Sequence, residues 1–521
     1  MMTTAEQKPI RLAEMVASLS LATDLGMGQP MEQALRTCLL SMRAARALAV
    51  TSPDLTATYY LALLRFVGCT ADAHEAALAA GGDEIADRAA IAPVVMADMR
   101  AYLGYLLRDL AKDSPLPTRL KLIARALGEG KEGANRQMAA HCEVAQMLAQ
   151  RMGLPGPVGV NVGATFERWD GKGIPGDLAA DTIPVPARIV SVARDVDIFY
   201  RLGGWPLASK VLLKRRGHAY SPDVAGAFID QGAAWLQELD ALPAWEAVLE
   251  AEPEPHMHVG ETELDAILGA FADFVDIKSP FTLGHSTEVA GLASKAAQHA
   301  SLHGDEVRDL CRAALVHDLG KAGIPNGIWD KPGSLSMSER ERVRLHPYLT
   351  ERILAPSAPL QRIALIAGSH HERLDGSGYH RGIQGEALTR ASRLLAAADV
   401  FQAMGQDRPY RPALAPDARV AALQHEAEAG RLDRDAVRCV LAAAGEHVSP
   451  RRASWPHGLT DREVEVLRLI SRGASNREVA GHLVISPKTA GRHIENIYAK
   501  INVSSRASAA LFALQNGLLR D

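Results

Sequence analysis

Hydrophobic positions recur at helical spacing along most of the chain, while runs of β-branched residues are scarce. Segments 311–324 (CRAALVHDLGKAGI) and 391–404 (ASRLLAAADVFQAM) are apolar with a few polar residues set among them. Segment 458–473 (GLTDREVEVLRLISRG) places apolar residues near i, i+3 and i+4, and its final glycine is typical of a helix C-terminus. Alanine and leucine, which are strong helix formers, are abundant throughout. The pattern predicts an all-α protein.

Two polar, proline-containing stretches divide the chain. They cover residues 249–260 (LEAEPEPHMHVG) and 446–457 (EHVSPRRASWPH), and such composition is typical of linkers between domains. At roughly 150 residues per domain, a chain of 521 residues should hold three or four domains. We therefore expect separate units at 1–248, 261–445 and 458–521.

The two long units repeat each other. Residues 164–175 (ATFERWDGKGIP) match residues 369–380 (SHHERLDGSGYH) at an offset of 205. Further matches pair 187–194 with 392–399, His141 with His346 and, at other offsets, 25–30 with 282–287 and 63–69 with 315–321. We infer two copies of one helical bundle.

The copies differ in their polar residues. The second copy has histidine, aspartate or lysine where the first has residues that are poor ligands for a divalent metal. The expected pairs are His285 with Gln29, His317 with Arg65, Asp318 with Phe66, Lys321 with Cys69, His370 with Thr165, His371 with Phe166, and Asp399 with Arg194. Only His141 matches a histidine.

Seven polar side chains of the second copy form a candidate metal site, namely His285, His317, Asp318, His346, His370, His371 and Asp399. Imidazole and carboxylate groups suit first-row cations. Seven ligands exceed one tetrahedral site and suit two ions that share a bridging carboxylate, for which Asp318 is the natural candidate. Lys321 follows three residues later and can reach a phosphate oxygen. Each histidine alone could be an ordinary core residue, but a structural role should have been kept in both copies.

The motifs KSPFTLGHS (278–286), LVHDLGKAGIP (315–325), SHHERLDGSGYH (369–380) and RPYR (408–411) resemble the HD-GYP family, a branch of the HD phosphohydrolases. The resemblance implies a helical metal-dependent phosphodiesterase that opens cyclic di-GMP to pGpG and sometimes to GMP. It implies two divalent ions, such as Fe or Mn, one held by His285, His317, Asp318 and Asp399 and the other by Asp318, His346, His370 and His371. Asp318 and Lys321 would be catalytic, and Lys321, Tyr379, Arg408 and Arg411 would contact substrate.

Two departures from the family pattern concern the second copy. His380 stands where the family usually has proline, which makes specificity for cyclic di-GMP less secure. Phe281 stands where members with a third metal have a carboxylate, which favours two ions. The first copy is expected to be degenerate, with a scaffold, dimerisation or ligand-sensing role. The Gly81–Glu84 segment (GGDE) imitates a cyclase signature but lies in a helical pattern, so we interpret it as a chance match.

The C-terminal unit resembles LuxR-type DNA-binding domains over 458–521. Ser475 and Ser486 are predicted N-caps and Pro487 fits a first helical turn, which gives a helix-turn-helix pattern. On this resemblance Lys488, Thr489, Arg492 and His493 should enter the major groove of double-stranded DNA, and Arg477 and Lys500 should contact phosphates. Useful specificity then calls for a homodimer. The alternative is a helical protein–protein module.

Composition limits these readings. A net charge of −4 excludes a polybasic protein as a whole, although a local basic face remains possible. The start shows no secretory signal, no apolar run approaches the length of a membrane span, and five scattered cysteines suggest a reduced, cytoplasmic protein without membrane contact. We expect a cyclic di-GMP phosphodiesterase fused to a transcription regulator. The alternatives are a nucleotide-responsive LuxR-type factor with little turnover, and a phosphohydrolase for another nucleotide.

Overall fold

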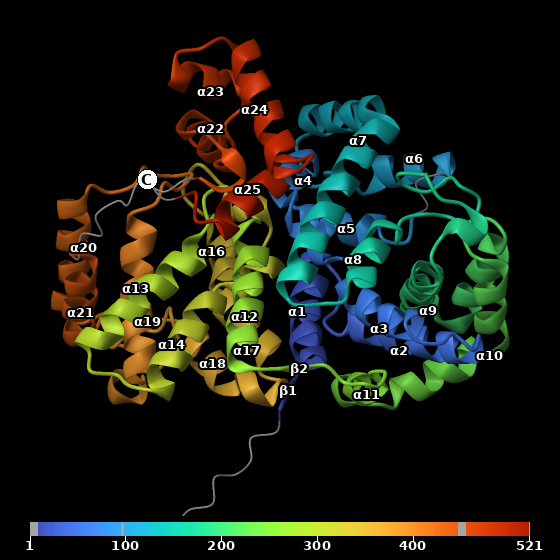
Figure 1. The fold of residues 1–521 in the computed structure, drawn as a ribbon, viewed down its shortest axis with the longest axis horizontal. Helices are drawn as coiled ribbons and strands as arrows, with labels where there is room; N and C mark the ends of the chain where they lie inside the picture. Colours follow the sequence, from blue (N-terminus) through green and yellow to red (C-terminus); the bar gives the residue numbers. More distant parts are fainter. Residues whose placement is uncertain (1–8, 95–97, 446–454, 520–521) are drawn as a thin grey trace, which may run out of the picture.

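Two helical bundles lie side by side, and a small third helical unit sits above the seam between them (Figure 1). The computed structural model describes residues 9–94, 98–445 and 455–519. Helices account for nearly all regular structure in these residues, as the hydrophobic pattern predicts. The exception is a short antiparallel pair, β1 (Ile10–Arg11) with β2 (His258–Val259), in which Ile10 is opposite Val259.

The first bundle runs from α1 to α11. Its helices are α1 (Leu12–Gly26), α2 (Gln33–Ala47), α3 (Asp54–Leu64), α4 (Ala73–Ala79), α5 (Glu84–Ile91), α6 (Met99–Arg108), α7 (Leu116–Arg151), α8 (Gly156–Gly163), α9 (Val185–Arg215), α10 (Pro222–Asp240) and α11 (Ala244–Ala251), with 3-10 turns η1 (Val67–Thr70) and η2 (Ala180–Thr182). Non-helical backbone at Gly203 and Gly204 interrupts α9.

The second bundle runs from α12 to α21. Its helices are α12 (Glu261–Asp276), α13 (His285–His299), α14 (Asp305–Val316), α15 (Asn326–Trp329), α16 (Met337–Arg344), α17 (His346–Leu354), α18 (Gln361–Ala367), α19 (Arg390–Met404), α20 (Pro416–Glu428) and α21 (Arg434–Ala444), with 3-10 turns η3 (Leu319–Gly323), η4 (Ala358–Leu360) and η5 (Gly385–Ala387). One continuous apolar core fills both bundles.

The structure corrects one pairing between the copies. Asp24 accepts the backbone N–H of Ala34, and Asp276 accepts the backbone N–H of Ser286 in the same way, ten residues further on in each case. His285, which precedes Ser286, therefore corresponds to Gln33. The expected match with Gln29 is therefore wrong by four residues.

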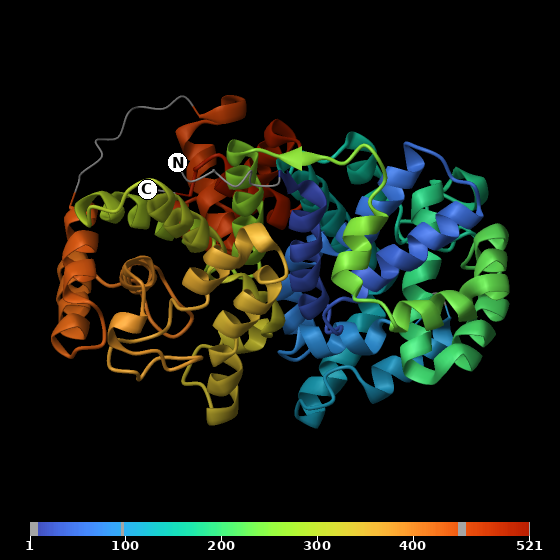
Figure 2. The same cartoon turned by 90° about the horizontal axis from the view of Figure 1, so that it is seen from below.

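The segment expected to be a linker at 249–260 is packed into the first bundle. Helix α11 extends through Ala251, and β2 pairs with β1. Glu252 is buried, where it forms an ion pair with Arg11 and accepts a 2.6 Å hydrogen bond from the Tyr60 hydroxyl. The connection is therefore a fixed strap along the bundle (Figure 2). Most of the second expected linker, residues 446–454, lies outside the described residues.

The GGDE segment serves as a contact between the bundles. It joins α4 to α5, so its surroundings are helical, as expected. Asp83 caps α5 by accepting the N–H of Ala86. Glu84 is buried and forms a 2.8 Å ion pair with buried Lys278 of the second bundle. Lys278 lies on the loop that leads to His285.

The third unit has its own core and is docked through its last helix. It contains α22 (Asp461–Ser471), α23 (Asn476–Leu483), α24 (Pro487–Ile501) and α25 (Arg506–Gln515), after the 3-10 turn η6 (Pro456–Gly458). Ser475 and Ser486 cap α23 and α24, and Pro487 begins α24, so these three predictions are confirmed. Glu143 of α7 accepts hydrogen bonds from the backbone N–H of Ser504 and the hydroxyl of Ser508, which fixes α25 at the seam.

Candidate metal centre

Four helix ends supply six of the seven candidate ligands, and one helix interior supplies the seventh. His285 begins α13, directly after Gly284, whose φ of 75° turns the chain into the helix. His317 and Asp318 follow α14, and His346 begins α17. His370 and His371 follow α18, and Asp399 lies inside α19. The structure thus brings together side chains that are up to 114 residues apart in sequence.

Three histidines are held in one tautomer by the same local contact. In each, Nδ1 lies at hydrogen-bond distance from the backbone carbonyl three residues earlier, at 2.7 Å for His317, 2.6 Å for His346 and 2.6 Å for His370. A carbonyl only accepts, so Nδ1 carries the proton and Nε2 is left with a lone pair. Metal-binding histidines are oriented in this way.

The Nε2 atoms of these histidines lie close together. Nε2 of His346 lies 3.1 Å from Nε2 of His370, so two lone pairs face each other. Nε2 of His317 is buried and has no hydrogen-bond partner among the described residues. Neither arrangement is favourable in a dry interior unless a cation lies between the nitrogens.

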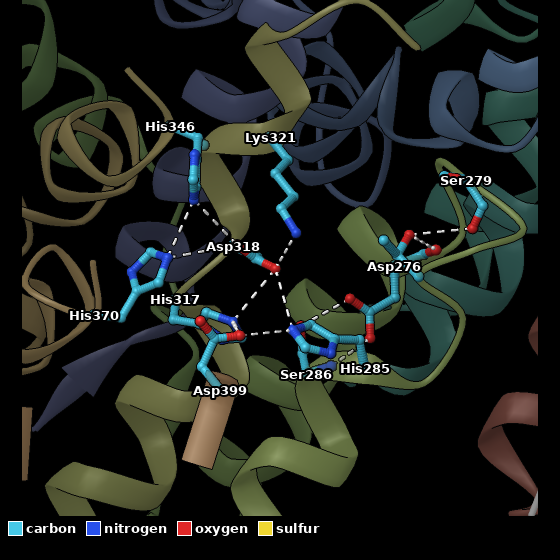
Figure 3. A network of polar contacts seen from close by, with 12 residues as sticks. Asp276, Ser279, His285, Ser286, His317, Asp318, Lys321, His346, His370 and Asp399 are labelled. Atoms are coloured by element: carbon cyan, nitrogen blue, oxygen red, sulfur yellow. Dashed lines mark hydrogen bonds and ion pairs between the residues drawn. The ribbon is translucent and has the colours of Figure 1, made fainter. Parts of the chain in front are cut away.

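Asp318 lies at the centre of the cluster (Figure 3). Its Oδ2 is 3.3 Å from His317 Nε2 and 3.6 Å from His285 Nε2. Its Oδ1 is 3.4 Å from His346 Nε2 and 3.7 Å from His370 Nε2. One carboxylate therefore faces two sets of imidazoles with its two oxygens.

The donor atoms fall into overlapping groups of metal-binding size. The atoms of each group lie within 4.8 Å of one another, and the groups are His285 with His317 and Asp399, His346 with His370 and His371, and His317 with Asp318 and His370. These residues are the seven expected from the sequence. The mixed nitrogen and oxygen donors fit a first-row cation.

Burial keeps most of these imidazoles neutral, which is the form that binds metal. It lowers the pKa of His285 and of His346 to about 4, and the pKa values of His370 and His371 well below the usual range. For His317 burial acts in the same direction, but the adjacent Asp318 carboxylate outweighs it and raises the pKa to about 10.

Lys321 points into the cluster from η3. The helix does not continue through it as an α-helix, but 3-10 geometry also places residues three apart on one side. Its ammonium group contacts Asp318 and lies 4.6 Å from the centre of the Trp329 ring. Trp329 also packs edge-on against His346. The lysine is thus positioned beside the metal ligands and away from bulk water.

The three other expected substrate contacts differ in availability. The Tyr379 ring lies 4.9 Å from the His371 ring and burial raises its pKa. Arg408 donates to the Phe281 carbonyl at 2.9 Å and to Gln406 at 3.1 Å, so it is partly engaged. Arg411 donates to four backbone carbonyls, including Ala403 at 2.7 Å at the end of α19. Arg411 therefore stabilises a helix C-terminus in this structure.

Sequence reasoning missed two residues beside the ligands. Gln406 holds His285 through a 3.1 Å contact between its Oε1 and the imidazole Nδ1, which again leaves Nε2 for a metal. Asp276 is buried, and its pKa is raised to about 7 by burial, with the nearby Asp318 carboxylate adding to the effect. Neither residue lies in a spacing typical of ligands, so the sequence carries no signal for them.

The helix-turn-helix unit presents part of the expected DNA surface. Lys488, Thr489 and Arg492 are exposed on α24, Arg477 is exposed on α23, and His493 is half-buried. Lys500, an expected phosphate contact, is engaged within the unit. Its ammonium group forms a 2.6 Å ion pair with Glu463 and donates to the Gly458 carbonyl at 3.1 Å.

A helical bundle that gathers histidines around a central His-Asp pair defines the class of metal-dependent phosphohydrolases. The chain belongs to the HD domain family, which matches residues 99–210 and 269–436. Residues 457–513 match the LuxR family of bacterial regulatory proteins. Both resemblances found in the sequence are confirmed.

Similar proteins match different shares of the chain. The 3'3'-cGAMP-specific phosphodiesterase 3 of Vibrio cholerae is 28% identical over 421 residues, which is 80% of this chain and 91% of that protein. The cyclic di-GMP phosphodiesterase response regulator RpfG of Xanthomonas campestris pv. campestris is 42% identical over 152 residues, 29% of this chain and 39% of that one. A crystal structure of a cyclic GMP-AMP-specific phosphodiesterase from V. cholerae superposes with a TM-score of 0.60 at 25% identity, covering 84% of this chain and 99% of that one.

Within the described parts of the chain, no helix combines the length and the apolar character that a membrane crossing requires.

Proposed function

We propose that the second bundle hydrolyses a phosphodiester bond of a cyclic dinucleotide, cyclic di-GMP, to pGpG or GMP, and that the C-terminal unit binds double-stranded DNA. One observation carries the catalytic part of this proposal. Histidines from three separate helix ends direct their Nε2 atoms at the two oxygens of Asp318, an arrangement that suits a cation.

The proposed centre holds two divalent ions, with Fe or Mn as candidates. His285, His317, Asp318 and Asp399 would hold one ion, and Asp318, His346, His370 and His371 would hold the other, with Asp318 common to both sets. When bound, two such ions activate a water molecule and neutralise charge that develops on phosphate oxygens. The protein fixes the ligand tautomers in advance through the backbone carbonyls, so little reorganisation accompanies metal binding.

Substrate orientation falls to side chains around the ligands. Lys321 supplies a positive charge next to Asp318, where it can hold a phosphate oxygen. Tyr379 offers a ring surface beside His371 for a base or ribose. Arg408 can pair with a phosphate through donors that its two contacts leave free. Arg411 acts through the end of α19 and so positions Asp399 and Gln406, rather than touching substrate.

The choice of dinucleotide is open to direct test, because similar proteins are named for two of them. The V. cholerae relative is specific for 3'3'-cGAMP, whereas RpfG is named for cyclic di-GMP. His380 lies in the loop expected to govern specificity, and its Nε2 is 3.5 Å from Glu351. We favour cyclic di-GMP on the HD-GYP motifs, with 3'3'-cGAMP as the runner-up.

DNA recognition would use α24, with Lys488, Thr489, Arg492 and His493 in the major groove and Arg477 on the phosphates. One such helix reads few bases, so we propose a homodimer acting in the cytoplasm. The docking of α25 at the seam between the bundles supports a link between nucleotide and DNA binding, because Gly284, adjacent to His285, lies against Leu514 of that helix.

The decisive experiment combines elemental analysis with a substrate panel on the purified full-length chain. We expect about two equivalents of metal and turnover of cyclic di-GMP, with slower release of product from 3'3'-cGAMP. Asp318→Asn should lose metal and lower kcat by at least about 1,000-fold, since it removes the shared ligand. Asp435→Asn, an exposed carboxylate on the same bundle, is the control.

Two outcomes would contradict the proposal. Wild-type protein that binds nucleotide tightly without releasing product would make it a nucleotide-responsive regulator. Turnover confined to another nucleotide would keep the enzyme and replace the substrate. DNA binding is scored separately by selection from random duplexes, with Arg492→Ala expected to abolish sequence preference.

A further inference from the structure

Helix α15 is a single turn, Asn326–Trp329, that contacts both the candidate metal centre and the first bundle. Its last residue, Trp329, packs edge-on against the ligand His346, with ring centres 5.5 Å apart. The Lys321 ammonium group lies 4.6 Å from the centre of the same ring. One indole therefore contacts a candidate metal ligand and the lysine that is expected to hold a phosphate oxygen. The placement of both side chains depends on where α15 is held.

The start of α15 receives its hydrogen-bond acceptors from the first bundle. A single helical turn is not stable by itself, and its first N–H groups have no partner inside the helix. Glu84, at the start of α5, is buried, and both of its carboxylate oxygens lie 3.0 Å from the backbone nitrogen of Asn326, which donates to them. The Gly82 carbonyl accepts the next N–H, that of Gly327, at 3.0 Å. The first bundle thus supplies the N-terminal cap of a helix in the second.

The other end of α15 is also held from the first bundle. Asp330 directly follows Trp329, and its carboxylate lies 2.7 Å from Nδ1 of His74 in α4. We call His74, Gly82 and Glu84 the α15 clamp. Its three residues contact a single helical turn at both ends, and Trp329 is adjacent to one of these contacts.

Glu84 also balances a buried charge. Lys278 is buried, and in the described part of the chain Glu84 is the one carboxylate within ion-pair distance of its ammonium group, at 2.8 Å. The same ammonium group donates to the Ile324 carbonyl at 2.8 Å and contacts the Asn326 side chain. Lys278 therefore ties the loop before His285 to the segment that enters α15. A buried ammonium group without its carboxylate is costly, so these contacts depend on the first bundle.

The backbones of the two bundles are in close contact at this point. A Cβ atom at Gly327 would overlap with the backbone of Gly82. Any side chain at position 327 would therefore move α15 away from the clamp, without a change in charge. This makes Gly327 a site at which the position of α15 can be altered selectively.

We propose that the α15 clamp of the first bundle positions Trp329 and, through it, Lys321 and His346 of the second. This role rests on the proposed function, and it gives the first bundle a part in metal binding and turnover although it supplies no ligand. Glu84 is then a positioning residue, because it acts through α15. An ordinary interface contact would affect stability alone, whereas the clamp affects metal affinity and kcat at equal stability.

Two variants disturb the clamp by different routes. Gly327→Ala moves α15 sterically, and Glu84→Leu combined with Lys278→Met removes both charges of the buried pair, so that neither is left unpaired. In both variants we expect kcat for cyclic di-GMP to fall about tenfold and the affinity of the metal-free full-length chain for Mn²⁺ to weaken about tenfold. Arg342→Gln, which breaks the exposed ion pair with Asp83 between the same bundles, is the matched control and should keep both values.

Trp329→Leu tests the route through the indole. It should lower kcat and Mn²⁺ affinity to the same extent, and adding Gly327→Ala should cause no further loss, because both changes act on one side chain. Losses that multiply would show that the clamp does not act through Trp329. Wild-type kcat and Mn²⁺ affinity in both clamp variants would reduce the clamp to a structural contact and overturn the proposal.

Failure of the clamp and failure of the proposed function give different results. A wild-type chain that turns over no cyclic dinucleotide contradicts the proposed function, and the Mn²⁺ affinities of the same variants then decide on the clamp. Urea unfolding shows whether each variant is folded and as stable as the wild type. If the double variant of Glu84 and Lys278 does not fold, Gly327→Ala decides.

Discussion

His141 in the first bundle and His346 in the second occupy the same place in the two copies of the fold. Their surroundings nevertheless favour the charged form of His141 and the neutral form of His346. The backbone carbonyls of both residues lie against an equivalent glycine, Gly68 and Gly320. His346 faces other imidazoles, and burial lowers its pKa to about 4. His141 lies between Asp72, at 2.6 Å, and Cys69, and despite burial the Asp72 carboxylate raises its pKa to about 10.

The difference extends to the residues around these histidines. In the second bundle the candidate ligands gather imidazole nitrogens and carboxylate oxygens, which suit cations. At the matching positions the first bundle has arginine, glutamine, threonine and phenylalanine, and its histidine is paired with Asp72. The comparison teaches that the first copy keeps polar side chains at these positions, but of types that are poor ligands for a divalent metal.

Replacing the paired histidines by leucine should produce opposite phenotypes, and this is the largest expected effect. His346→Leu removes a metal ligand from a neutral setting, so we expect loss of metal and a fall in kcat of at least about 1,000-fold, with little loss of stability. His141→Leu removes the imidazolium partner of buried Asp72 and leaves Arg88, at 3.0 Å, as its ion-pair partner, so we expect destabilisation by about 1–3 kcal/mol and unchanged metal content. Metal analysis, steady-state kinetics and urea unfolding measure these effects. Similar phenotypes for the two variants would show that the copies are not divided in this way.

The same residue makes the stability of the first bundle depend on pH. The pKa of His141 is raised to about 10 in the folded state, so its contribution to stability is complete below about pH 6.5 and is lost as pH rises towards 10. Its partner Asp72 has a pKa lowered to about 2, mainly because His141 outweighs the effect of burial, and limits stability only in acid. We expect the free energy of unfolding to decrease between pH 6.5 and 10 by a few kcal/mol.

Urea titrations at intervals across this range, followed by hydrogen exchange at amides of α7, test the pH dependence. His141→Gln should flatten the alkaline decrease, because glutamine does not titrate. His74→Gln, which removes another histidine with a raised pKa from the first bundle, is the matched control. An equally steep decrease in the His141→Gln protein would assign the effect to another group.

The sequence predicted which seven side chains come together but not the geometry that orients them. The candidate ligands and the two-copy organisation followed from motif order and from the absence of the same residue types in one copy. The carbonyl contacts of His317, His346 and His370 could not be predicted, because they depend on where each helix ends to within one residue. For the same reason the match of His285 was placed four residues from Gln33.

The contacts of long side chains could not be predicted from the sequence either. Lys500 and Arg411 are spaced as DNA and substrate contacts, but tertiary structure brings Glu463 to the former and the end of α19 to the latter. Glu84 belongs to the GGDE segment, which resembles a cyclase signature. It lies at the interface between the bundles because Lys278 of the second bundle forms an ion pair with it. Local patterns carry no information on such pairings, which are set by how distant helices pack.

The smallest expected effect concerns the loop after the two ligand histidines. His380 of the second bundle corresponds to Pro175 of the first, so the first copy has the residue that is usual in the family. The His380 imidazole packs against Tyr348, with ring centres 5.5 Å apart, and its Nε2 lies 3.5 Å from Glu351. His380→Pro should therefore leave metal content unchanged and alter kcat/KM for each dinucleotide by less than about tenfold, since a surface loop contact of this kind is worth about 1 kcal/mol. The informative readout is the ratio of rates for cyclic di-GMP and 3'3'-cGAMP. A shift in that ratio at constant metal content assigns His380 to substrate specificity. Loss of metal would instead mean that the loop supports the metal centre, and that the two copies differ in one more structural element.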